Sequence, residues 1–161
     1  MRKLSLRMFS KEEARELKTL FWTAFGKYMG KHNSASGSKV KWVNYKTGVN
    51  DIYIRLHCDA KKASISIDLQ HQDEGIRELF LEQFQQLKAI LDAQLKEEWD
   101  WNSEHYTETG QKIVRISKTR NGVNLFRKDD WKEIFEFYES RMVALDAFWS
   151  EFGELFIMLS R

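Results

Sequence analysis

Two neighbouring segments, 51–58 (DIYIRLHC) and 63–70 (ASISIDLQ), alternate strictly between apolar and polar residues. Strict alternation predicts a half-buried β-strand, and the four residues between the segments suit a hairpin loop. Folding about that loop places Ile54 opposite Ile67, so the two apolar rows share one face. Because a lone hairpin is marginally stable in water, the chain must extend this sheet and cover its apolar face.

Two segments with helical periodicity are expected to cover the apolar face of the sheet. Segment 10–30 opens with Ser10 and Glu13, a capping-box pattern that predicts a helix start, and its apolar residues then recur at helical spacing. Segment 73–99 carries the widest apolar stripe and is predicted to be one long helix that covers the sheet.

A long aromatic-rich helix is predicted over 131–159. Asp130 and Glu133 have the spacing of a second capping box at its start. A bend or an end near Gly153 remains an alternative to one continuous helix.

Further strands complete the expected architecture. Segment 39–45 (KVKWVNY) is rich in β-formers, 112–118 (KIVRISK) reads as another strand, and Trp99 with Trp101 suggests a short one. The sequence therefore predicts a single α+β domain over 1–161. Its sheet should be mainly antiparallel, with four or five strands, and the element order α-β-β-β-α-(β)-β-α.

Charge is unevenly distributed although the net charge is only +2. Residues 1–50 hold 11 basic and 3 acidic side chains, 51–110 hold 6 and 13, and 111–161 hold 9 and 8. Stretches 17–50 and 109–128 lack acidic residues. If they meet in space they form a basic patch, and otherwise they are ordinary solvated faces.

Several classes of site are disfavoured. Cys58 is the only cysteine, which excludes an intramolecular disulfide and a thiolate zinc site of the usual kind, and it falls on the apolar face as an inert thiol. We find no export signal and no membrane span, and expect a cytoplasmic protein without a cofactor or bound metal. The oligomeric state stays open.

Asp51, Asp68 and Gln70 are the candidate catalytic residues. The predicted order of a helix, three strands, a helix and a strand resembles the core of restriction-endonuclease-like nucleases. That resemblance implies magnesium bound by an aspartate on the second strand and by an acidic-x-lysine motif on the third. The hairpin register brings Asp51 and Gln70 opposite each other on the face of Asp68, but glutamine replaces the expected lysine. The alternative for Asp68 is a solvent-facing hydrogen bond across to Tyr53.

A binding surface is the other candidate site. Aromatic and basic residues interleave through the same region, a mixture that stacks bases and holds phosphates. Its predicted members are Lys39, Lys41, Tyr45, Lys46, Tyr53, Arg55 and His57. The turn after Tyr45 leaves open whether Trp42 or Val43 faces the core, and Trp42 is favoured.

Five sequence blocks carry a family resemblance: SKEEARELKTLFWTAFGKYM, KVKWVNYKTGVNDIYIRL, GIRELFLEQF, GVNLFRKDDW and ALDAFW. In this order they resemble a bacterial family catalogued as domain of unknown function 4268, over residues of about 8–150. The resemblance implies no established activity and no catalytic residues to transfer. In longer proteins a similar domain follows a nuclease-like or restriction-associated module, which favours a role with nucleic acid.

Three functional hypotheses follow. The first is a non-catalytic binding module whose partner is nucleic acid or a nucleic-acid-processing protein of the nuclease type. The second is an active or degenerate metal-dependent nuclease that uses Asp51 and Asp68 with Mg²⁺. The third is a structural module that oligomerises through its aromatic C-terminal helix.

Overall fold

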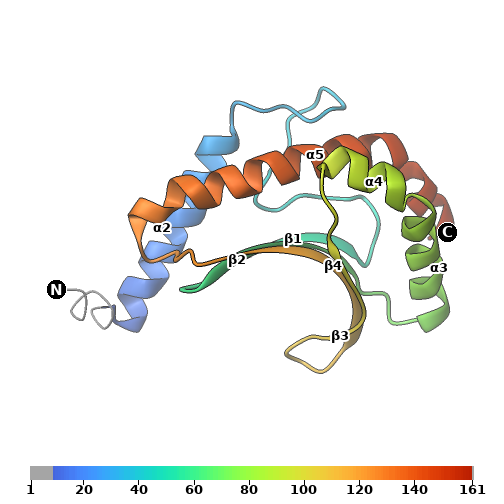
Figure 1. Ribbon diagram of the computed structural model, residues 1–161, viewed down its shortest axis with the longest axis horizontal. Coiled ribbons are helices and arrows are strands. Elements are labelled where there is room, and N and C mark those ends of the chain that lie inside the picture. The colour runs from blue at the N-terminus through green and yellow to red at the C-terminus, as the bar shows by residue number, and fades with distance from the viewer. Residues whose placement is uncertain (1–8, 161) are drawn as a thin grey trace.

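The computed structural model describes residues 9–160 and confirms the α+β class (Figure 1). Its elements are α2 (Lys11–Met29), β1 (Ile52–Cys58), β2 (Lys62–Leu69), α3 (Glu74–Gln86), α4 (Lys88–Leu95), β3 (Asp100–Tyr106), β4 (Lys112–Asn121), a 3₁₀ turn (Lys128–Asp130) and α5 (Trp131–Leu159). Residues 1–8, where the sequence predicts no export signal, lie outside the described part. Among the described helices, none is long and apolar enough to cross a membrane.

The sheet has four antiparallel strands in the order β1-β2-β4-β3. The predicted hairpin register is confirmed, because Ile54 pairs with Ile67 and Leu56 with Ile65. On its other side β2 pairs with β4, so Ile67 also lies opposite Ile116. The apolar row therefore crosses the central strands without a break.

The strand predicted at 39–45 is wrong, and the three-strand meander is therefore not formed. This segment lies in an irregular connection between α2 and β1. Its β-forming residues pack on helices instead: Trp42 is only 4% exposed, and Tyr45 bonds to Asp146 of α5. β-propensity largely reports a preference for half-buried packing, which a helix surface also offers.

One predicted helix is divided, and the long helix predicted over 131–159 is confirmed. The segment predicted as one helix over 73–99 divides at Leu87, so that α4 turns to run beside α5 (Figure 1). In the last helix, α5 continues unbroken through Gly153 to Leu159.

The first predicted capping box is confirmed and the second is wrong. Ser10 and Glu13 each accept a hydrogen bond from the other's backbone N–H. Asp130 is instead the last residue of the 3₁₀ turn and has helical backbone angles, and its carboxylate accepts from the Asn124 N–H. Glu133 pairs with Arg120. The preceding turn thus removes the extended backbone that an N-cap needs.

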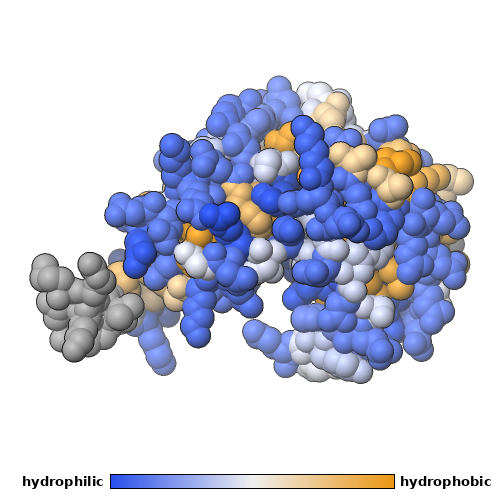
Figure 2. Space-filling view, in the orientation of Figure 1, coloured by the Kyte–Doolittle hydropathy of each residue, from blue (hydrophilic) through white to orange (hydrophobic). Residues whose placement is uncertain are grey.

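The helices lie on one side of the sheet, where one core joins them to its apolar face (Figure 1). Cys58 is buried there, and burial raises the pKa of its thiol to about 12. On the other side the β3–β4 hairpin curls away from the helices and back beneath the sheet. Figure 2 shows the hollow between this hairpin and the body of the molecule, with mainly hydrophilic residues around it. The sheet therefore has one open, concave face.

Candidate binding face on the open side of the sheet

The concave face is defined by the strand registers, because directly paired residues of an antiparallel sheet point to the same side. Starting from the polar row of β1 and following each pairing across the sheet gives one set of side chains. They are Tyr53, Arg55 and His57 on β1; Ser64, Ser66 and Asp68 on β2; Ile113, Arg115, Ser117 and Thr119 on β4; and Asp100, Asn102 and His105 on β3.

Asp68 is the buried centre of this face. Its exposed fraction is 0%, and Arg115 holds it with a two-pronged contact, Nε to Oδ1 and Nη2 to Oδ2, each 2.8 Å. From the opposite strand, the Arg55 Nε lies 3.3 Å from Oδ2. Such paired, charge-assisted contacts are among the strongest hydrogen bonds in proteins. Two arginines therefore share one carboxylate at the floor of the face.

Neutral side chains extend the network to both edges. The Arg115 Nη1 lies 3.0 Å from the His105 Nε2, and desolvation together with the charge of Arg115 lowers the pKa of this imidazole. A neutral His105 accepts the bond. At the other edge the Arg55 Nη2 donates to the Gln70 Oε1 at 2.8 Å, and Gln111 donates to the Gln70 carbonyl at 2.8 Å.

The β1 side chains remain available to solvent. The Arg55 guanidinium stacks on the Tyr53 ring, 4.3 Å from its centroid, while that tyrosine is 38% exposed. The Arg55 side chain is 47% exposed and that of Arg115 31%. His57 is 60% exposed beside Asp59. An aromatic ring and a guanidinium thus lie together on β1, at one wall of the face.

The three candidate catalytic residues do not converge as metal ligands. Both Asp68 oxygens already face guanidinium groups, whose positive charge opposes a bound cation. The Asp51 carboxylate lies 4.0 Å from His71, and Gln70 is occupied by Arg55. Within residues 9–160, no three His, Cys, Asp or Glu side chains gather as a metal site would require.

The predicted binding residues separate into two surfaces. Tyr53, Arg55 and His57 lie on the concave face, whereas Lys39 and Lys41 line a pocket of about 400 Å³ beside Trp42, on the segment that rises above α5 in Figure 1. Lys46 is exposed on the same segment. Tyr45 has a structural role, because its hydroxyl donates to the buried Asp146 at 2.6 Å.

The two acid-free stretches meet at Phe126, where the Lys18 ammonium lies 6.0 Å from the ring centroid and Arg127 is the next residue. Elsewhere ion pairs neutralise several of their cations. These pairs are Lys31 with Glu139, Lys112 with Glu104, Arg115 with Asp68, and Arg120 with Glu133. The basic residues therefore do not form one continuous patch.

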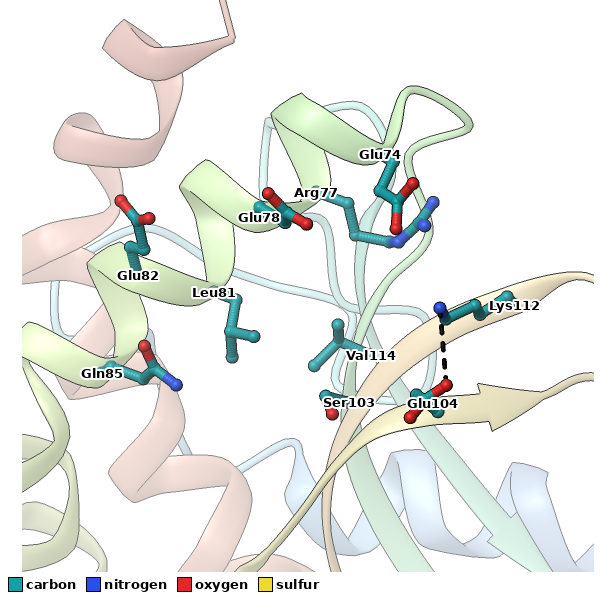
Figure 3. A pocket seen from close by; sticks show the side chains of 10 residues that line it. All are labelled: Glu74, Arg77, Glu78, Leu81, Glu82, Gln85, Ser103, Glu104, Lys112 and Val114. Atoms are coloured by element: carbon teal, nitrogen blue, oxygen red, sulfur yellow. Dashed lines mark ion pairs between the residues drawn. The ribbon is translucent and has the colours of Figure 1, made fainter.

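A pocket of about 500 Å³ lies between α3 and the β3–β4 hairpin (Figure 3). Its acidic members are Glu74, Glu78, Glu82 and Glu104, and its basic members are Arg77 and Lys112. Lys112 pairs with Glu104 at 3.6 Å, and Arg77 is buried and donates to the His71 carbonyl at 2.7 Å. Because side chains alternate along a strand, Lys112 points to the opposite side of β4 from Arg115. Anions are disfavoured here by charge.

Sequence reasoning missed Arg115, His105 and Gln111 as members of the site. The alternation of KIVRISK does place Arg115 outside the apolar row. Its contact with Asp68, however, depends on pairing between β2 and β4, which are 47 residues apart at this contact. Nothing local in the sequence specifies that pairing.

Comparison with curated proteins and with solved structures finds no match. A family model described as domain of unknown function (DUF4268) matches residues 17–153. The match spans every described strand and most of the helical cover. The chain belongs to the DUF4268 family.

Proposed function

We propose that this protein is a non-catalytic module that binds nucleic acid on its concave face. The observation that carries the proposal is the sharing of the buried Asp68 by Arg55 and Arg115. Two positive charges against one negative charge leave an excess of one positive charge at this cluster, and Asp100 at the β3 edge is the other carboxylate among the strand residues of the face.

Both arginines can bind a further anion. A guanidinium has five N–H donors, and the contacts described above occupy two on Arg55 and three on Arg115. Asp68 fixes the orientation of the planar groups, which lowers the entropy lost when they bind a phosphate. The partly exposed side chains then present the remaining N–H groups to solvent.

Nucleic acid fits this face better than a protein surface does. The centres of protein interfaces are depleted in serine and aspartate, and the strand residues of this face include Ser64, Ser66 and Ser117 together with two aspartates. An exposed tyrosine beside an arginine is the combination that stacks bases and holds phosphates. The acidic pocket on the other side of the hairpin repels a polyanion, which disfavours binding on that side.

Fluorescence anisotropy with short labelled oligonucleotides over a salt series tests the proposal. We expect affinity to fall steeply with salt, and Arg55→Ala to reduce the log–log slope by about 0.7 because one phosphate contact is lost. Lys112→Ala is the matched control, since it removes one positive charge from the opposite side of the sheet and should leave the slope unchanged. Absence of binding at low salt, or equal losses in the two variants, would overturn the proposal.

The two alternatives have weaker support. A metal-dependent nuclease built on Asp51 and Asp68 requires free carboxylate oxygens, and those of Asp68 are engaged by arginines. The oligomerisation hypothesis was based on aromatic residues of the last helix. In the structure, Phe148, Trp149 and Phe156 of α5 are buried in the core of their own chain.

A further inference from the structure

We infer that the ligand is a single strand, with one of its bases stacked on Tyr53 and its backbone following a trough of hydroxyl side chains. The inference rests on the proposed nucleic-acid function and narrows its ligand. Three features of the concave face carry it: a floor of small residues, a wall with an exposed ring, and the curvature of the sheet.

The floor of the trough consists of short hydroxyl side chains. Ser66 pairs with Arg55 on one side and with Ser117 on the other, and in the next row Ser64 pairs with Thr119. Arg55 and His57 of β1 flank these rows on one side, and on the other side β3 reaches the row of Ser117, where Asp100 pairs with it. Ser66 is only 6% exposed, in the row between Arg55 and Ser117 on the face opposite the helical core. Hydroxyls both donate and accept hydrogen bonds, so such a floor suits sugar and phosphate oxygens.

The wall formed by β1 offers a platform for one base. One side of the Tyr53 ring is covered by the Arg55 guanidinium, and the tyrosine keeps 38% of its surface exposed. A base that stacks on this ring brings its own phosphate close to the neighbouring arginine. Stacking of this kind needs an unpaired base, because the bases of a duplex are already stacked on each other.

The shape of the face also selects against a duplex. The floor is two strands wide, with strands about 5 Å apart, and the curled β3–β4 hairpin closes one side of the trough (Figures 1 and 2). A single extended strand can enter such a recess. The rounded surface of a double helix meets the hairpin before its phosphates reach Arg115.

Competition binding at one fixed salt concentration tests the inference, with single-stranded DNA, single-stranded RNA and a blunt duplex of the same sequence. We expect at least one single strand to bind at least tenfold tighter than the duplex. Tyr53→Ala should weaken single-strand binding by about 5- to 100-fold, and Tyr53→Phe should retain it, because the ring and not the hydroxyl stacks. Urea unfolding of both variants checks that they fold.

The possible outcomes distinguish failure of the single-strand inference from failure of the proposed nucleic-acid function. If duplex and single strands bind equally and both depend on Arg55, the inference fails and the proposed function stands. If no nucleic acid binds, the proposed function itself fails. If Tyr53→Ala folds and binds single strands as tightly as the unmodified protein, the stacking assignment is overturned.

Discussion

Three carboxylates, those of Asp68, Glu139 and Asp146, are each held by donors from distant parts of the chain and connect the elements of this fold. Asp68 joins β2 to β1 and β4 through two arginines. Glu139 of α5 contacts Tyr28 in the last turn of α2, and Lys31 and His32 just after that helix. In each case the charge is stabilised by several donors, which is why a carboxylate can lie in a largely buried position.

The contacts of Glu139 predict a pH dependence of stability. Burial opposes its ionisation, but hydrogen bonds from Tyr28, His32 and Lys31 outweigh burial and lower its pKa from 4.5 to about 2. A lowered pKa in the folded state stabilises the protein above the unfolded-state pKa, and this contribution is lost as the pH falls from about 4.5 to about 2. Glu139→Gln should therefore be about 1–3 kcal/mol less stable at pH 7, with a difference that shrinks over that range.

Urea unfolding at a series of pH values measures this difference. Glu136→Gln is the control, because Glu136 is exposed on the same helix and its substitution should change stability little at any pH. A constant difference between the unmodified protein and Glu139→Gln from pH 7 to pH 2 would contradict the assigned role.

Two helical glycines should respond oppositely to alanine. A Cβ at Gly153 would lie 2.8 Å from the Trp149 Nε1, which donates to the Thr47 carbonyl at 2.7 Å. Overpacking should outweigh the gain in helix propensity and lower stability by about 1–2 kcal/mol. At Gly26 the Cβ would meet Val43 at 3.7 Å, an ordinary contact, so Gly26→Ala should raise stability by about 0.5–1 kcal/mol. Equal shifts of the urea midpoint in the two variants would be inconsistent with this packing.

At the scale of elements, the irregular connection over residues 30–51 is ordered by side chains and not by a strand ladder. Asp146 of α5 is 2% exposed and accepts hydrogen bonds from the Ser34 hydroxyl, the Ala35 N–H and the Tyr45 hydroxyl at 2.6–2.8 Å. The indole of Trp149 donates to the same connection at Thr47. One face of α5 thus holds this segment in place.

Loss of the Asp146 hydrogen bonds should increase local opening of the connection more than opening of the sheet. We expect Asp146→Ala to lower global stability by about 2–4 kcal/mol and to increase amide hydrogen exchange over 33–47 more than in β2. Tyr45→Phe removes one donor of three and should cost about 1 kcal/mol. Hydrogen exchange followed by mass spectrometry measures the opening of the connection in both variants. Unchanged exchange in the connection of Asp146→Ala would show that other contacts order it.

Local sequence patterns predicted an element correctly where its packing partners are close to it in the sequence. The β1–β2 hairpin has a four-residue loop and two alternating segments, so its register follows from the sequence alone. The segment 39–45 has the composition of a strand but finds its partners on α2 and α5, which no local pattern specifies. For the same reason the β1 half of the candidate site was predictable and Arg115 and His105 on the far strands were not.

At the scale of the whole molecule, the two sides of the sheet have opposite roles. The helices and the aromatic core use the apolar face, and the concave face carries the shared carboxylate, the arginines and the hydroxyl floor. The hairpin separates this face from an acidic pocket behind it. Under the proposed function, the acidic pocket disfavours a polyanion on one side of the hairpin and the concave face is the expected site.

NMR titration of ¹⁵N-labelled protein with a short single-stranded oligonucleotide locates the binding surface. We expect shifts of the Arg55 and Arg115 Nε–H signals and of amides along β1, β2 and β4, with little change near Lys39 and Lys41. Shifts confined to the pocket beside Trp42, or no shifts at low salt, would contradict the proposed binding on the concave face.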